Sequence, residues 1–151
     1  MINRFEQFST AVSCIYRCIQ KIERVEMARF GLKGPHVQCL LAMKNYPDGI
    51  TSSQLCTLCE KDKAAISRTV AELEREGLIL RGCAAGNRYR ARLTLTEAGS
   101  HIACHVDDRV RIAVEKAGEG LDDEARKIFY AVLGLIAGNL QTICTEGLEE
   151  T

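Results

Sequence analysis

Residues 50–79 read ITSSQLCTLCEKDKAAISRTVAELEREGLI, and this stretch decides the fold. Thr51, followed three residues later by Gln54, forms a capping box, which predicts that a short helix begins here. Asp62 is suited to cap a second helix, and residues 60–62 alone separate the two. Two short helices joined by so tight a link are typical of a helix-turn-helix.

The hydrophobic period changes from that of a helix to that of a strand after Gly77. Leu78 and Leu80 predict a first strand, residues 83–87 a loop, and residues 88–95 a second strand. Arg88, Arg90 and Arg92 alternate along this second strand and are expected to share one face. A helix-turn-helix followed by a basic hairpin is a winged helix.

The flanking segments read as long helices. Apolar residues in the N-terminal segment recur at spacings of three and four, and that helix is expected to end near Gly31. It either packs on the core of its own domain or contributes to a dimer. Further helices are predicted to begin at Pro35, at Thr96 and near Leu121. The predicted fold class is mainly α with a small β-hairpin wing, on a single chain over residues 1–151.

Charge is unevenly distributed along a chain whose formal net charge is zero. Residues 61–92 hold eight basic and four acidic residues, a net of +4, whereas residues 118–151 hold two basic and seven acidic, a net of −5. This asymmetry allows a nucleic-acid footprint in a neutral protein. The second short helix is slim enough for the major groove of DNA, and arginines on the hairpin suit the adjacent minor groove. The predicted DNA-contacting residues are Ser52, Ser53, Lys61, Lys63, Ser67, Arg68, Thr69, Arg88, Arg90 and Arg92.

Composition excludes several classes. Hydrophobic residues make up 46% of the chain, which excludes a disordered protein. We find neither an uninterrupted apolar run of membrane-spanning length nor an apolar signal region, so we expect a cytoplasmic protein without a membrane partner. In that reducing compartment the eight cysteines are expected to be free thiols.

Three stretches resemble the MarR family of bacterial regulators: residues 50–55, residues 62–79 and residues 88–99. The most specific feature is the combination of ISRTVAELEREGLI with LTLTEAG across a basic wing. The resemblance implies a homodimeric transcriptional regulator, a repressor on a pseudo-palindromic double-stranded DNA operator. It implies dimerisation helices over residues 1–31 and 96–145 around a winged helix-turn-helix over residues 34–95. It also implies release of DNA by a small-molecule inducer or by thiol oxidation.

The wing departs from the family pattern at one position. The family usually has Asp-Arg-Arg before the second strand, where this chain has Asn87-Arg88-Tyr89. Arg88 matches the key arginine of the wing, but Asn87 lacks the carboxylate that would orient it through a charged pair. Wing contacts are therefore expected to be looser, or shared with Arg90.

Effector sites are less strongly indicated. His101 and His105 are four residues apart on one predicted helix, and with His36 and Cys39 they form a candidate metal site. Cys56 and Cys59 form an isolated CxxC that core packing explains, and no cysteine is singled out as a redox sensor. The default ligand site is the cleft between the winged domain and the dimerisation helices, with Arg29, Lys33 and His36 as nearby candidates.

Catalysis is not expected, because the chain has no G-x-S-x-G, glycine-rich phosphate loop or H-E-x-x-H motif. No cofactor is expected either. Two alternatives to a ligand-released repressor remain: a thiol- or metal-responsive regulator of the same fold, and a winged helix that binds protein instead of DNA. Salt dependence separates the last from a DNA-binding protein, because neutralising phosphates makes affinity fall steeply as salt rises.

Overall fold

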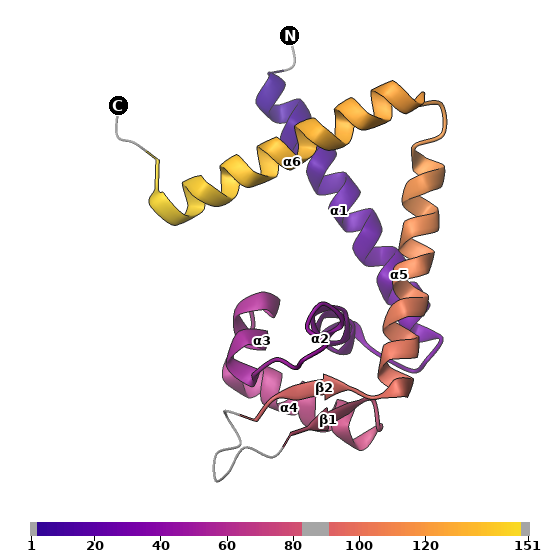
Figure 1. Ribbon diagram of the computed structural model, residues 1–151, viewed down its shortest axis with the longest axis vertical. Helices are drawn as coiled ribbons and strands as arrows, with labels where there is room; N and C mark the ends of the chain where they lie inside the picture. The colour runs from indigo at the N-terminus through magenta and orange to yellow at the C-terminus, as the bar shows by residue number, and fades with distance from the viewer. Residues whose placement is uncertain (1–2, 83–90, 149–151) are drawn as a thin grey trace. The chain divides into compact units, whose positions relative to one another are not determined.

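The computed structural model describes residues 3–82 and 91–148 (Figure 1). In these ranges the chain forms helices α1 (Arg4–Ala28), α2 (Gly34–Lys44), α3 (Ser52–Cys59), α4 (Lys63–Arg75), α5 (Glu97–Ala117) and α6 (Asp123–Glu146), with strands β1 (Ile79–Arg81) and β2 (Leu93–Leu95). The chain divides into two compact units, residues 1–112 and residues 113–151. The predicted class, mainly helical with a small antiparallel hairpin, is confirmed.

Side-chain caps fix the helix-turn-helix at both of its helix starts. The Thr51 hydroxyl accepts the Gln54 backbone N–H at 3.2 Å, and the Gln54 side chain accepts the Thr51 backbone N–H at 2.9 Å. The Asp62 carboxylate accepts the Ala65 backbone N–H at 2.8 Å, which begins α4. Between the helices, Glu60 adopts a left-handed conformation with φ of 52°, which closes α3 and turns the chain sharply.

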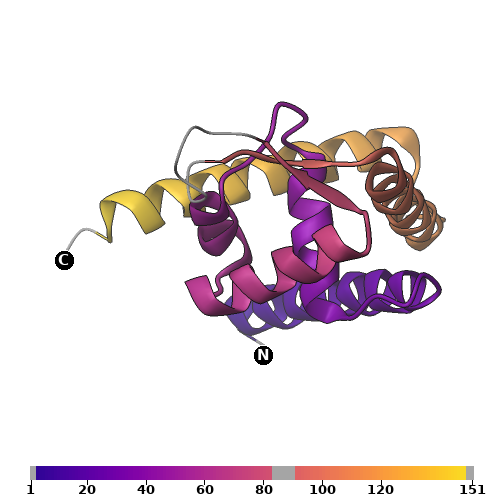
Figure 2. The same cartoon turned by 90° about the horizontal axis from the view of Figure 1, so that it is seen from below.

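The core of the first unit lies around α2. This helix packs against α3, α4 and β2, while α4 also packs against β1 (Figure 2). The largest fully buried side chains include Leu40 and Met43 from α2, Leu55 from α3 and Leu73 from α4. Burying these side chains supplies the main driving force for holding the short helices at fixed angles.

The two strands are shorter than predicted and shifted in phase. β1 pairs antiparallel with β2 in the register Ile79–Leu95, Leu80–Thr94 and Arg81–Leu93, and Ile50 adds a bridge to Leu93. The strand was predicted from Leu78 and Leu80, but within it Ile79 faces the core and is 1% exposed, whereas Leu80 is 59% exposed. The tight turn after α4 buries both Leu78 and Ile79, so the alternation begins one residue later than the sequence suggested.

Polar contacts fasten α5 to α1 and α2. The carboxylate of Glu26 on α1 is buried and lies 3.3 Å from His105 and 3.4 Å from Arg109, both on α5. Burial alone would raise the pKa of Glu26, but the His105 hydrogen bond and the charges of Arg29 and Arg109 outweigh it and hold this pKa below its ordinary value. Lys44 on α2 forms an ion pair with Asp107 on α5.

The second unit consists mainly of α6. Asp122 caps this helix by accepting the Ala125 backbone N–H at 2.7 Å. None of the α6 residues that the structure describes is buried, although many are apolar. By length and composition α6 is also apolar enough to cross a membrane, although the sequence contains no uninterrupted apolar run of that length. A helix with so much exposed apolar surface needs a partner of some kind.

Candidate nucleic-acid interface

A hollow of about 690 Å³ lies between the N-terminal ends of α3 and α4. It is lined by Ser52, Ser53, Cys56, Lys61, Asp62, Lys63, Ser67 and Arg81, and we call it the α3–α4 groove. The helix-turn-helix therefore brings together five of the predicted DNA-contacting residues: Ser52, Ser53, Lys61, Lys63 and Ser67. Charged and hydroxyl donors on one surface suit contact with phosphate oxygens and base edges.

The outer face of α4 continues this surface. Lys63, Ala64, Ser67, Arg68 and Ala71 are all exposed, and each lies three or four residues from another of the set. Spacing of three and four places them on one side of the helix. The two alanines leave the helix backbone free to approach a ligand closely, while Lys63 and Arg68 supply positive charge. This combination suits a helix that enters the major groove.

The carboxylates of α4 are engaged within the protein. Glu72 accepts a hydrogen bond from His36 Nε2 at 2.6 Å, and Glu74 accepts from Arg81 at 2.8 and 3.1 Å. The His36 hydrogen bond, aided by the positive charges of Arg75 and Lys33, holds the pKa of Glu72 below its ordinary value. These contacts offset negative charge that would otherwise repel a phosphate backbone.

The two helix starts offer different chemistry to a phosphate. Ser52 and Ser53 occupy the first turn of α3, where backbone N–H groups lack intrahelical acceptors and suit an anion. At α4 the Asp62 carboxylate already caps the N-terminus, which makes that end unfavourable for phosphate. The start of α3 is thus the better phosphate contact.

Thr69 does not belong to this surface. We expected it to contact DNA, but its side chain is buried and its hydroxyl donates to the Ala65 carbonyl at 3.0 Å. The position of Thr69 around the helix axis explains this. It follows Ile66 by three residues and precedes Val70, so it faces the core with them. Ser67 and Arg68 precede it on the exposed side.

The wing is described only at its base. Arg88 and Arg90, with Asn87 and Tyr89, lie outside the described residues. Arg92 does not continue a free arginine face, because its guanidinium donates to the Gly49 carbonyl at 3.3 Å. Gly49 has φ of 103°, and a Cβ there would lie 2.8 Å from the Arg92 Cβ, so the arginine packs directly on the loop between α2 and α3.

Arg81 is a site residue that the sequence reasoning missed. It lines the α3–α4 groove and its guanidinium holds Glu74. It was counted in the basic segment but not singled out, since no motif marks it. Arg81 directly follows two hydrophobic residues of the first strand, and this position was the sequence feature that could have indicated its role.

The four candidate metal ligands are not brought together. His36 bonds Glu72 and accepts the Lys33 backbone N–H, Cys39 contacts Cys59, His105 bonds Glu26, and His101 is exposed. Over residues 3–82 and 91–148 no group of three or more candidate ligands has metal-binding geometry. The spacing was suitable, but each side chain except His101 has a different partner.

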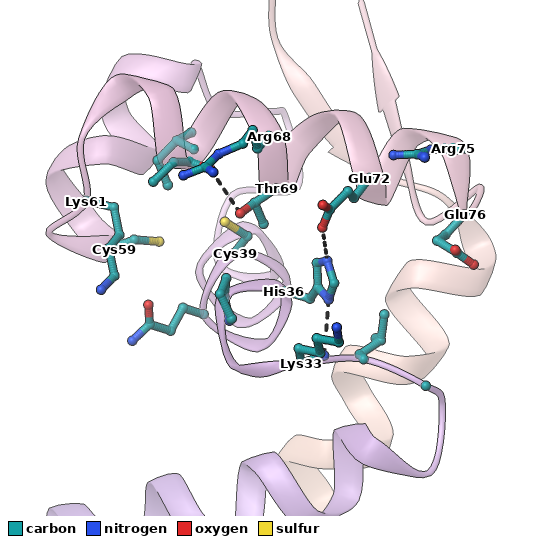
Figure 3. Close-up of a pocket in the computed structure, with 16 residues that line it drawn as sticks. Lys33, His36, Cys39, Cys59, Lys61, Arg68, Thr69, Glu72, Arg75 and Glu76 are labelled. Atoms are coloured by element: carbon teal, nitrogen blue, oxygen red, sulfur yellow. Dashed lines mark hydrogen bonds and ion pairs between the residues drawn. The ribbon is translucent and has the colours of Figure 1, made fainter.

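A second hollow, of about 660 Å³, lies between α2 and α4 (Figure 3). Cationic side chains gather at it, namely Lys33, Lys61, Arg68 and Arg75, together with His36, Cys39, Cys59 and Glu72. We call it the α2–α4 hollow. Of the predicted ligand-site candidates, Lys33 and His36 line it, whereas Arg29 lies beside Glu26 at 3.6 Å.

The order α3, α4, β1, β2 on a supporting α2 defines a winged helix-turn-helix protein. Residues 30–88 match the model of the MarR family. No curated protein sequence matches the chain.

Solved structures match nearly the whole length. The crystal structure of MarR is 25% identical, with 97% of this chain and 99% of that one covered and a TM-score of 0.77. A MarR transcriptional regulator from Methanosarcina mazei Go1 is 22% identical, with 95% and 94% covered and a TM-score of 0.75. A MarR family regulator from Listeria monocytogenes, solved with a 26mer DNA, is 19% identical, with 94% and 96% covered and a TM-score of 0.70. The chain is therefore similar to the MarR family over residues 30–88, and its fold is that of the solved MarR transcriptional regulators.

Proposed function

We propose that this protein is a cytoplasmic transcriptional regulator that binds double-stranded DNA sequence-specifically, as a homodimer on a pseudo-palindromic operator. One observation carries the proposal: the α3–α4 groove and the exposed face of α4 form a continuous surface of lysine, arginine and serine, with the nearby carboxylates of Glu72 and Glu74 engaged internally. The DNA-bound Listeria relative of the same fold supports it.

Exposed apolar residues on α1 and α6 support the homodimer. On α1 these include Phe5, Val12 and Ile15, and on α6 they include Ile128 and Leu135. Such surface is unfavourable in water and is covered when two chains associate. The two DNA-contacting surfaces of a homodimer would match the two halves of a pseudo-palindromic operator.

The proposed mode of action is repression that a small molecule relieves. Support comes from the α2–α4 hollow, where four cationic side chains outnumber two carboxylates and favour an anionic compound: Lys33, Lys61, Arg68 and Arg75 against Glu72 and Glu76. Arg68 belongs both to this hollow and to the exposed face of α4. An anion there would compete with phosphate for the same guanidinium.

Substitution on α4 tests the DNA-binding proposal. If Arg68 and Ser67 reach base edges, Arg68→Ala and Ser67→Ala each weaken specific binding by about 1–3 kcal/mol. The matched control is Arg24→Ala, which removes an exposed arginine from α1. Fluorescence anisotropy with duplexes that tile the upstream region of the protein's own gene measures the affinities of the wild type and the three variants. Equal affinities for wild type, Arg68→Ala and Ser67→Ala would contradict the docking, and a steady affinity across salt concentrations would favour a protein partner.

A further inference from the structure

The His36 side chain on α2 joins the start of its own helix to α4. Its Nδ1 accepts the Lys33 backbone N–H at 3.1 Å, and its Nε2 lies 2.6 Å from a carboxylate oxygen of Glu72 (Figure 3). Because Nδ1 accepts a hydrogen bond and so carries no proton, this pattern assigns the ring the neutral tautomer whose Nε2–H donates to Glu72. The His36 side chain is only 13% exposed, which shelters the bond from competing water.

This hydrogen bond draws the Glu72 carboxylate away from two arginines on its own helix. Glu72 follows Arg68 by four residues and precedes Arg75 by three, so each arginine lies one turn away along α4. All three residues line the α2–α4 hollow. Figure 3 shows the Glu72 carboxylate turned toward His36, while the Arg68 side chain extends away from it. Within residues 3–82 and 91–148, no ion pair joins Glu72 to either arginine.

The two arginines belong to the outer face of α4. Ala64, Arg68, Ala71 and Arg75 follow one another at intervals of four, three and four residues, which places them in one row along the helix. All four are exposed. The two guanidinium groups therefore supply the positive charge of this row. A carboxylate that paired with either of them would withdraw that charge from DNA.

We propose that His36 is a positioning residue for DNA binding: it holds the Glu72 carboxylate toward α2 and thereby keeps Arg68 and Arg75 available to DNA. Without His36, the carboxylate is free to rotate along α4, where the nearest cations of its own helix are these two arginines. The role in DNA binding rests on the function proposed above, whereas the contact between His36 and Glu72 does not.

The freed carboxylate would be an effective competitor for a guanidinium. Besides the His36 hydrogen bond, the charges of Arg75 and Lys33 lower the pKa of Glu72, so the carboxyl stays ionised near neutral pH when the histidine is absent. The Glu72 side chain is 51% exposed, which leaves it room to change rotamer. A carboxylate and a phosphate bind the same paired N–H donors of an arginine, so that occupation by one excludes the other.

Two substitutions separate the two hydrogen bonds of His36. His36→Asn places an oxygen near the position of Nδ1, so it can still accept the Lys33 backbone N–H, but its side chain is too short to reach Glu72. His36→Gln places an amide nitrogen near the position of Nε2, so it can still donate to Glu72. A loss of DNA binding in the first variant and its retention in the second would assign the effect to Glu72 and not to the start of α2.

Fluorescence anisotropy with a duplex that the wild type binds measures the affinities of the full-length variants. His36→Ala and His36→Asn should bind roughly three- to tenfold more weakly than the wild type, because an arginine that pairs with Glu72 no longer neutralises a phosphate. His36→Gln should stay close to the wild type. Glu72→Gln should bind at least as tightly as the wild type, because it removes the competing charge.

A double-mutant cycle separates positioning from a merely structural role. In the Glu72→Gln background, His36→Ala should no longer weaken DNA binding, because no carboxylate remains there to compete for the arginines. Glu76→Gln is the matched control, since it removes another carboxylate that lines the α2–α4 hollow, and it should not rescue His36→Ala. Circular dichroism and thermal unfolding establish that each variant is folded.

Two results would overturn the role of His36: an affinity of His36→Asn equal to that of the wild type, or an equal loss from His36→Ala with and without the Glu72 carboxylate. Carbon-13 NMR titration of the Glu72 carboxyl tests the contact without DNA. Its midpoint should be higher in His36→Ala than in the wild type, because the hydrogen bond that favours the carboxylate is lost, and equal midpoints would contradict the contact. Absence of DNA binding by the wild type would instead refute the proposed function, and the titration would still report on the contact.

Discussion

At the residue scale, Gly99 shows how closely the hairpin approaches α5. A Cβ at this position would lie 2.0 Å from the Leu78 carbonyl oxygen, which is backbone and cannot rotate away. Gly99→Ala should therefore destabilise the protein by about 1–3 kcal/mol or more, the usual cost of overpacking. Gly34→Ala is the control, because nothing lies within 4 Å of its Cβ. Urea unfolding measures both, and equal stabilities would contradict the packing.

The reactivity of Cys59 should depend on pH as a low-pKa thiol does. The thiolate is the nucleophile, so alkylation by iodoacetamide rises with pH and reaches half its maximum near the pKa of about 7. In Cys39→Ala the hydrogen bond from Cys39, which lowers this pKa, is lost and the midpoint moves upward. Rates of alkylation at Cys59, followed by mass spectrometry from pH 5.5 to 9.5, measure this. An identical midpoint in both proteins would show that Cys39 does not stabilise the thiolate.

The sequence predicted the roles of individual side chains better than it predicted which residues those side chains contact. The capping roles of Thr51 and Asp62 follow from local spacing and are confirmed. The partners of His36 and Cys39 were not predictable, because Glu72 and Cys59 are distant in sequence and packing alone brings them together. Thr69 was predicted to contact DNA because its side chain is polar. Its spacing from Ile66 and Val70 nevertheless places it on the buried face of α4.

At the scale of elements, Asp62 has two opposing effects on α4. Its carboxylate caps the helix but places a negative charge in the α3–α4 groove. Asp62→Ala should cost about 1 kcal/mol of stability through the lost cap. Asp62→Ser should keep the cap. Both variants should bind DNA about fivefold more tightly, because removing the carboxylate removes about 1 kcal/mol of repulsion from the phosphates.

Thermal or urea unfolding and DNA anisotropy separate these effects. Stability should fall in Asp62→Ala and hold in Asp62→Ser, while affinity rises in both at low salt. Lower affinity in Asp62→Ser would mean that the carboxylate faces a donor on the DNA instead of a phosphate.

In the short strands, hydrophobic periodicity does not predict which residues face the core. Leu78, Ile79 and Leu80 are all apolar, so alternation could not establish which of them faces the core. The turn after α4 decides it, since Leu78 closes the helix end and Ile79 begins the strand. Leu58 on α3 is also apolar but 48% exposed, because Leu55 and Cys59 already fill the buried side of that helix.

At the scale of the whole molecule, the proposed binding to a pseudo-palindromic operator requires a dimer. Ile128 and Leu135 lie two turns apart on one face of α6, and both are exposed. Light scattering should give the wild type twice its mass of 16.7 kDa, and the Ile128→Asp, Leu135→Asp double variant should approach the single-chain mass. Lys127→Ala is the control on the same helix. A wild type that stays at the single-chain mass, or that partitions into lipid vesicles, would contradict the proposed partner of α6.

The architecture was predictable because local signals agree over residues 50–79, where caps, period and charge all indicate one structure. The packing of α6 was not, because its apolar residues lie all around the helix and none of its described residues is buried. The sequence pattern indicates that such a helix needs a covering surface, but it does not identify that surface.

The most direct test of the central claim is a salt series of DNA binding by the wild-type protein. Anisotropy is measured with duplexes that tile the upstream region of its own gene, from 50 to 200 mM salt. If six to ten phosphates are neutralised, one tile should be bound saturably and its affinity should fall by about 10³-fold or more across this range. Equal, weak binding to every tile with little change across the salt range would contradict an operator-binding regulator.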